Sequence, residues 1–244
     1  MTDVCEGVAM LAEVMDKDAK CTYKPDEKTW KANLDGDGKK LGDNLGNKPN
    51  ASKESELSSK KWPSQAHHLI PHLTLKKHAV ACWLKGDDEI WGDTQYNVDH
   101  ENNGKWMPYA SSLSEWVTGA TKVEDKNSNR KLMFKVMSLA RIQMHQGKHS
   151  GSKRYGIGEA PYKERVSQYL EKIDNNAISH YSEPKPCKDC KGDKAGKLPP
   201  RQNTVRYVDK ASGLIEKDID CCRIFVSKIA AEFAELGGFK SLGS

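Results

Sequence analysis

The pattern of apolar and polar positions predicts a chain made mostly of short helices. Apolar side chains recur at Leu132, Val136, Leu139 and Ala140, which is the spacing of one helical face. Glycines and a proline mark helix ends, because Gly147 and Gly237 favour termination and Pro161 suits a first turn. Helices are expected at residues 7–16, 73–84, 130–146, 161–174 and 219–236.

Two further segments are expected to contain strands. Residues 65–71 form a short apolar run that Pro71 closes. Residues 95–109 predict a strand, a turn and a second strand, with Asn103-Gly104 as the turn signal. Short strands among predominant helices predict the α+β class.

Residues 33–60 resemble a linker, because Gly, Asn, Asp, Ser and Lys dominate them. Asp35-Gly36-Asp37-Gly38 resembles the start of a calcium loop, but the later oxygen ligands and the closing glutamate are missing. A turn-rich linker is therefore preferred to a calcium site. The chain is expected to comprise an N-terminal helix and polar linker (1–60), a core (61–180) and a cysteine-containing segment with a final helix (181–244).

Composition limits the classes of protein that fit this pattern. With 244 residues, 36% hydrophobic residues and a mean hydropathy of -0.78, the chain is polar for a globule, so loops or tails are expected. The net charge of +5 permits a polyanionic partner without requiring one. No apolar run approaches the length of a membrane span, and residues 1–18 lack the basic start of a secretory signal.

Histidines supply the clearest chemical signal. His67 and His68 are adjacent, so on a strand they point to opposite faces and are expected to take different roles. His145 and His149 are four residues apart, so they either share a helical face or, given Gly147, straddle a helix end. Imidazole can bind a metal or act as a general base, and phosphodiester hydrolysis uses both functions.

An ordinary structural origin for these histidines is the competing interpretation. The chain holds 8 histidines, so one adjacent pair and one His-x-x-x-His spacing can arise by chance. The two signals together favour a one-metal hydrolase site with three ligands and one base. His72, His78, His100 and His180 are expected to be structural or surface residues.

The arrangement resembles a known family. The segments "QAHHLIP" (65–71), "NVDHENNGKWMPY" (97–109) and "HQGKHSGSKRY" (145–155), with the helix at 161–174, closely resemble AHH nucleases of the HNH/endonuclease VII superfamily. The resemblance covers residues 61–175, about half of the chain. It departs from the family pattern at residues 110–144, which insert a helix before His145.

The resemblance implies a ββα-metal finger, embedded in a mostly helical domain, that holds one divalent ion (Mg, Mn, Ni or Zn). His67, His145 and His149 would be the metal ligands. His68 would be the general base, and Asn103 would help to hold the backbone that carries it. His67, His68 and Asn103 are thus the expected catalytic residues.

The same resemblance implies a biological role. It points to an endonuclease that cuts DNA, and to a secreted antibacterial toxin such as a type VI secretion effector. Export from the bacterial cytoplasm would need no signal peptide, action would follow in the target cell's cytoplasm, and a cognate immunity protein and a secretion component or chaperone would be partners. An RNase on the same fold and a non-catalytic zinc-binding adaptor or delivery module are the alternatives.

Cysteines and basic residues leave two further questions open. Cys187-x-x-Cys190 with Cys221-Cys222 could form a structural zinc site, although adjacent cysteines rarely chelate one zinc and an apolar helix at 219–236 would make the second pair ordinary buried thiols. The basic residues that flank the expected metal shell are candidates for phosphate binding or for a solvated face; they are Lys148, Lys153 and Arg154.

Overall fold

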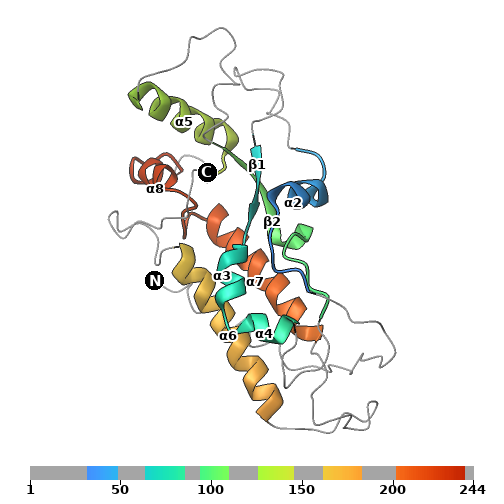
Figure 1. Cartoon of the computed structure of the whole chain (residues 1–244). Helices are drawn as coiled ribbons and strands as arrows, with labels where there is room; N and C mark the ends of the chain where they lie inside the picture. Colours follow the sequence, from blue (N-terminus) through green and yellow to red (C-terminus); the bar gives the residue numbers. More distant parts are fainter. Residues whose placement is uncertain are drawn as a thin grey trace. The chain divides into compact units, whose positions relative to one another are not determined.

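Helices and one small antiparallel sheet make up the described part of the chain (Figure 1). The structure, a computed structural model, describes residues 32–48, 64–85, 94–109, 126–145, 162–182 and 202–239. The elements in these ranges are α2 (Gly38–Leu45), β1 (Ser64–His68), α3 (His72–Lys77), α4 (Val80–Lys85), η2 (Glu101–Asn103), β2 (Gly104–Pro108), α5 (Lys126–Ala140), α6 (Tyr162–Ser182), α7 (Gln202–Asp220) and α8 (Lys228–Glu235). The α+β class is confirmed, while the helix expected at 7–16 lies outside the described residues.

The chain divides into two compact units that are described separately. The first contains residues 1–36, 70–98 and 166–214, and the second contains residues 37–69, 99–165 and 215–244. Both strands, and all the site residues that are discussed below and that the structure describes, belong to the second unit.

The strands β1 and β2 pair in antiparallel fashion, with His67 opposite Lys105 and His68 opposite Gly104. Because paired residues of an antiparallel sheet share a face, His67 and Lys105 lie on one face. Ala66 and His68 lie on the other, since side chains alternate along a strand. The strand is shorter than the predicted 65–71, because it ends at His68.

The helix α2 covers the sheet face that carries Ala66 and His68 (Figure 1). Gly42 brings its backbone close to the Trp106 ring, where a Cβ atom would come within 3.1 Å. Leu41 is fully buried, and its Cδ1 atom lies only 2.7 Å from where a Cβ atom on Gly104 would be. Asp37 begins the helix, because its side chain accepts a hydrogen bond from the Lys39 backbone N–H.

The linker expected at 33–60 is therefore wrong for the part that forms α2. Its glycines and aspartates suit helix capping and close packing as well as they suit a loop. The apolar residues are few, but Leu34 and Leu41 are both buried, at 1% and 0% exposure. Sparse composition concealed a short helix whose single buried leucine is enough to dock it.

The second strand expected within 95–109 is present as β2, but the local hairpin expected there is wrong. Asn33 pairs with this segment instead, since its N–H donates to the Tyr96 carbonyl at 2.7 Å and its carbonyl accepts from the Val98 N–H at 2.9 Å. The turn signal Asn103-Gly104 lies where η2 meets β2, and β2 pairs with β1. A partner distant in sequence thus replaced the expected local hairpin.

Three predicted helices have different bounds. The helix expected at 73–84 is divided into α3 and α4, because His78 is extended and its Nδ1 accepts from the Val80 N–H at 3.3 Å. The helix expected at 130–146 ends at Ala140, since Arg141 adopts a left-handed backbone with φ of 53°. By contrast, α6 continues eight residues beyond the expected 161–174, to Ser182.

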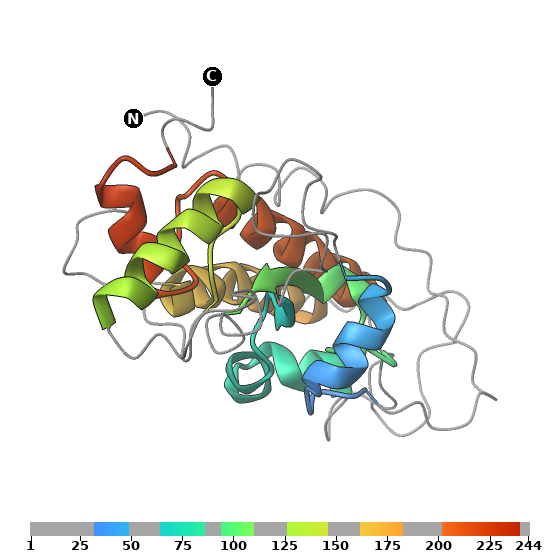
Figure 2. The same cartoon turned by 90° about the horizontal axis from the view of Figure 1, so that it is seen from above.

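The C-terminal helix expected at 219–236 is wrong in its first half. An unpredicted helix, α7, ends at Asp220, and Cys221 and Cys222 form a turn in which Cys222 has φ of 55°. Ser227 then caps α8, whose end at Gly237 was expected. The helices α5 and α8 pack together around a shared core (Figure 2); its buried residues are Val136, Met137, Met144, Phe225, Ile229, Ala230, Ala231 and Phe233.

Among the helices that the structure describes, none combines the length and the apolar character that crossing a bilayer requires.

Leu41→Ala should lower the free energy of unfolding by about 2–5 kcal/mol, because it leaves a cavity between α2 and the sheet. Denaturant unfolding followed by circular dichroism measures this change. Leu73→Ala is the matched control, since Leu73 is 59% exposed and its loss should have little effect. Equal stability of the two variants would mean that α2 does not contribute to the core.

Candidate functional site

The alternation of β1 sends its two histidines into different surroundings. His67 is 3% exposed and lies on the face opposite the one that α2 covers. The His68 side chain is 13% exposed and lies at the strand's end. The two imidazoles therefore have separate partners, and the different roles expected of them stay a prediction.

The buried Tyr162 hydroxyl fixes the hydrogen of His67. Tyr162 donates its single hydroxyl hydrogen to the Leu69 carbonyl at 2.6 Å. The His67 Nε2 atom lies 3.2 Å from the same hydroxyl oxygen, so Nε2 must be the donor there. In this arrangement His67 has its hydrogen on Nε2, and its lone pair is on Nδ1.

Tyr162 was not among the sequence candidates, although it begins α6. Burial raises the pKa of its hydroxyl above the ordinary value, so it remains a hydrogen-bond donor. The signal that could have identified it is its place on the buried stripe of the helix, with Val166, Tyr169, Leu170 and Ile173. A tyrosine on such a stripe needs a partner for its hydroxyl.

His145 reaches the same region from beyond the end of α5. Its backbone N–H donates to the Pro108 carbonyl at 2.8 Å, which extends the chain alongside the end of β2. The preceding Gln143 is held by three hydrogen bonds, since its Nε2 donates to two carbonyls of the α7–α8 turn and its Oε1 accepts from the Val226 N–H. Ser227 also donates to the Met144 carbonyl at 2.5 Å. These contacts place His145 without a helix.

The rings of His67 and His145 lie next to each other. Their centroids are 4.9 Å apart and their planes are tilted by 56°. The ring of Tyr109 stacks on His145 at 5.9 Å. Burial lowers the pKa of His145, which favours the neutral imidazole that binds metals.

The centroid spacing of this pair is one that two imidazole ligands of a single metal ion would have. Metal–nitrogen bonds of about 2.1 Å at a tetrahedral angle place two imidazole centroids roughly 5 Å apart. Within the ranges that the structure describes, no group of three or more His, Cys, Asp or Glu side chains is arranged to hold a metal. The third expected ligand, His149, lies outside those ranges.

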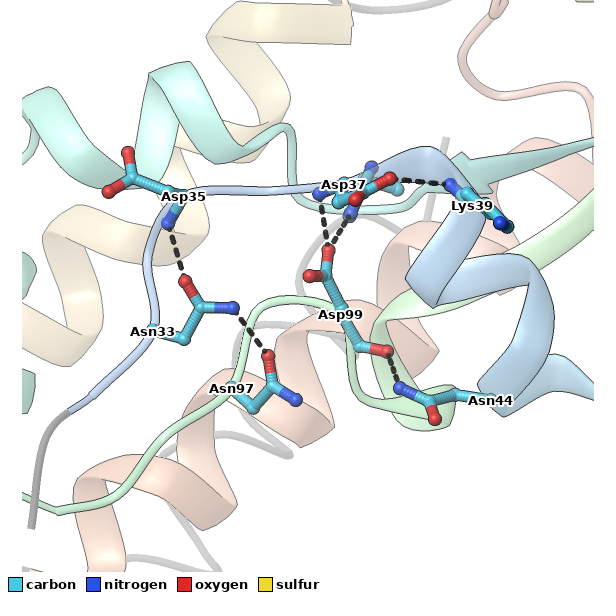
Figure 3. A network of polar contacts seen from close by, with 8 residues as sticks. Asn33, Asp35, Asp37, Lys39, Asn44, Asn97 and Asp99 are labelled. Atoms are coloured by element: carbon cyan, nitrogen blue, oxygen red, sulfur yellow. Dashed lines mark hydrogen bonds and ion pairs between the residues drawn. The ribbon is translucent and has the colours of Figure 1, made fainter.

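His68 pairs with Asp99, which was not among the residues predicted from the sequence; Figure 3 shows the contacts of Asp99 with Asp37 and Asn44. The Asp99 Oδ1 atom lies 2.8 Å from His68 Nε2 and accepts a hydrogen bond from the Asp37 N–H, also at 2.8 Å. The Asp99 backbone carbonyl accepts from the Asn44 side chain at 2.7 Å. Since an ionised carboxylate only accepts, His68 carries its hydrogen on Nε2.

The sequence offered a weak signal for Asp99. It follows the buried Val98 and precedes His100, which is exposed and caps η2. A carboxylate next to a buried apolar residue can itself be buried, but the sequence does not indicate its partner. The partner His68 is 31 residues away, and the Asp37 donor is 62 residues away.

Asn103 is fully buried at the end of η2. Its carbonyl accepts from the Leu69 N–H at 2.9 Å, which joins the end of β1 to the start of β2. This is a main-chain hydrogen bond that any residue at position 103 could make, so the catalytic role expected of Asn103 stays a prediction.

The second face of the sheet is anchored by ion pairs to α7. Lys105 contacts Glu216 at 2.8 Å and Asp220 at 2.9 Å. Burial lowers the pKa of Lys105, but these two hydrogen bonds outweigh it and the net pKa is raised. Arg165 and Asp218 form a further buried pair at 2.9 Å. The two ion pairs of Lys105 attach the sheet face that carries His67 to the end of α7.

Of the remaining predicted site residues, the structure describes only Cys221 and Cys222. His149, Lys148, Lys153, Arg154, Cys187 and Cys190 lie outside the described residues. Cys221 is exposed, and burial raises the pKa of Cys222 to about 11. In the turn that holds them, Cys221 and Cys222 are not part of a described metal-binding group.

Comparisons of the chain with models of protein families, with curated proteins and with solved structures find no match. The resemblance to AHH nucleases therefore rests on the motif residues. Any activity has to be argued from the side-chain geometry around His67 and His68.

Tyr162→Phe should lower the free energy of unfolding by about 1–3 kcal/mol, because it deprives His67 Nε2 and the Leu69 carbonyl of one shared partner. Tyr109→Phe is the control, since it keeps the ring that stacks on His145. Thermal and chemical unfolding of the metal-free proteins measure both changes. A neutral result for Tyr162→Phe would show that its hydroxyl does not hold His67.

The lowered pKa of His145 predicts a pH dependence of stability. Below pH 6.5 the unfolded state binds a proton at His145 more readily than the folded state does, so stability should fall as pH falls. The slope from this residue is at most about 1.4 kcal/mol per pH unit. Unfolding of metal-free wild type and His145→Gln at pH 7.5, 6.5 and 5.5 should give a shallower slope in the variant, and equal slopes would contradict the prediction.

Proposed function

We propose that this protein is a metal-dependent endonuclease that hydrolyses phosphodiester bonds, with β1 and β2 as the strands of a ββα-metal finger. One observation carries the proposal. The adjacent His67 and His68 lie on opposite faces of β1, and a separate partner holds Nε2 of each. In each ring the hydrogen is thus on Nε2 and the lone pair is on Nδ1, while His67 is buried and His68 is only partly buried.

His67, His145 and His149 would hold the divalent ion, with His67 using Nδ1. Bound there, the ion would neutralise charge on the phosphate and on the leaving oxygen. Two features of the described residues support this assignment. The rings of His67 and His145 have a spacing that suits one ion, and His145 favours the neutral form.

His68 would act as the general base. Its Nδ1 takes a proton from a water molecule, the water oxygen forms a bond to phosphorus, and the bond from phosphorus to the departing ester oxygen breaks. His68 is only partly buried, whereas His67 is buried, so water has more access to His68. Asn103 would keep the backbone at the end of β1 in register with β2.

DNA is the proposed substrate, and RNA is the alternative on the same site. The net charge of +5 suits a polyanion, and Lys148, Lys153 and Arg154 would contact its phosphates. The AHH resemblance further supports a role as a secreted antibacterial toxin, neutralised in the producing cell by an immunity protein. Export through a signal-independent apparatus, with action in the target cytoplasm, belongs to the same proposal.

Removal of the base tests this function directly. Plasmid and tRNA are each incubated with EDTA-treated protein after addition of magnesium, manganese, nickel or zinc. His68→Ala should lower kcat by about 10²–10⁴-fold, because no other described group is assigned to accept the proton. His78→Ala is the control, since His78 caps α4 and lies outside the proposed site.

The outcome also separates the nuclease from a zinc-binding adaptor. An adaptor would bind zinc tightly, unfold on chelation and cut neither substrate. Metal-dependent cutting that is lost in His68→Ala but kept in His78→Ala would support the nuclease. Equal cutting by wild type and His68→Ala would contradict the assigned base.

A further inference from the structure

We propose that Asp99, held in place by both ends of α2, is a positioning residue that fixes the ring of His68 with Nδ1 as its basic nitrogen. This inference rests on the proposed function, and it assigns to residues 37–45 a part in the site. It concerns the orientation and tautomer of His68 and involves no contact between Asp99 and substrate.

The carboxylate of Asp99 is buried among hydrogen-bond donors. The Asp99 side chain is 1% exposed, and a buried carboxylate is costly unless donors surround it. Its Oδ1 atom accepts from His68 Nε2 and from the Asp37 backbone N–H, each at 2.8 Å. A carboxylate held by a backbone donor cannot follow the imidazole if the ring turns, so it selects one ring orientation.

Both ends of α2 donate hydrogen bonds to Asp99 (Figure 3). Asp37, at the N-terminal end of the helix, donates to the carboxylate, and Asn44, in its last turn, donates to the backbone carbonyl of the same residue. Residue 99 is thereby held through both its side chain and its main chain. The helix itself is fixed to the sheet by Leu41, so the position of Asp99 follows that of β1 and β2.

The contact with Asp99 also decides which ring nitrogen of His68 carries the hydrogen. A neutral imidazole without a fixed partner distributes its hydrogen between Nδ1 and Nε2, and in the Nδ1-protonated form Nδ1 cannot accept a proton. The Asp99 carboxylate requires hydrogen on Nε2, so the tautomer with its lone pair on Nδ1 is selected. Asp99 would thus raise the fraction of enzyme molecules in which His68 is in the tautomer with its lone pair on Nδ1, and it would not change substrate binding.

The test uses the full-length chain with Asp99→Ala and the conservative variant Asp99→Asn. Asp99→Ala should lower kcat by about 10–100-fold with KM within twofold of wild type. Asp99→Asn, whose amide oxygen can accept the same hydrogen bonds, should fall between the two. Thr94→Val is the control for stability alone, since it removes a buried hydrogen bond to the Leu84 carbonyl and should leave kcat unchanged.

A second readout does not depend on activity. In ¹⁵N spectra of histidine-labelled protein, the ring of His68 is identified by its absence from His68→Ala. Wild type should show the form protonated on Nε2, and Asp99→Ala should show a mixture of tautomers.

The outcomes distinguish this inference from the proposed function. An unchanged kcat or an unchanged His68 spectrum in Asp99→Ala would overturn the role of Asp99, while cutting by wild type would still support the nuclease. If wild type cuts neither DNA nor RNA with any metal, the proposed function fails. The spectra alone would then show whether Asp99 fixes His68.

Discussion

The two-residue period of β1 is the constraint on which the site depends. Pairing with β2 fixes which face each residue of β1 meets, so a shift of register by one residue would exchange the surroundings of His67 and His68. Two contacts oppose such a shift. Ala66 is buried against α2, and His67 is buried on the other face against Tyr162. A strand of five residues thereby keeps two adjacent imidazoles in separate chemical settings.

Each face is completed by polar contacts that satisfy buried groups. On the His67 face, Tyr162 connects the ring to the Leu69 backbone, and Lys105 reaches two carboxylates of α7. On the other face, Asp99 connects His68 to the start of α2. Tyr162 and Asp99, which orient the two histidines, are both more deeply buried than His68. Buried partners of this kind keep the imidazole rings rigid.

Local signals in the sequence predicted the α+β class, the start of β1, the region of α6 and the end of α8 at Gly237. They failed where distant residues decided the outcome. Asn33 took the hydrogen bonds that a hairpin at 95–109 would have used, and His78 interrupted a helix by capping the next one. The sequence motifs also led us to expect His67 and His145 in one place, and their rings do lie next to each other. Asp99 and Tyr162 were not predictable, because their partners are 31 and 95 residues away.

The reach of these contacts also has a consequence for biosynthesis. The partners of Lys105 follow it by 111 and 115 residues, and the Tyr162 hydroxyl that orients His67 follows by 95. Non-local contacts of this kind form late, since the intervening chain must first be closed into a loop. A ribosome-bound chain that ends before Asp220 therefore lacks groups that the finished site contains. The ion pairs of Lys105 therefore form only after residues 216 and 220 have left the ribosome, when nearly the whole described chain has been made.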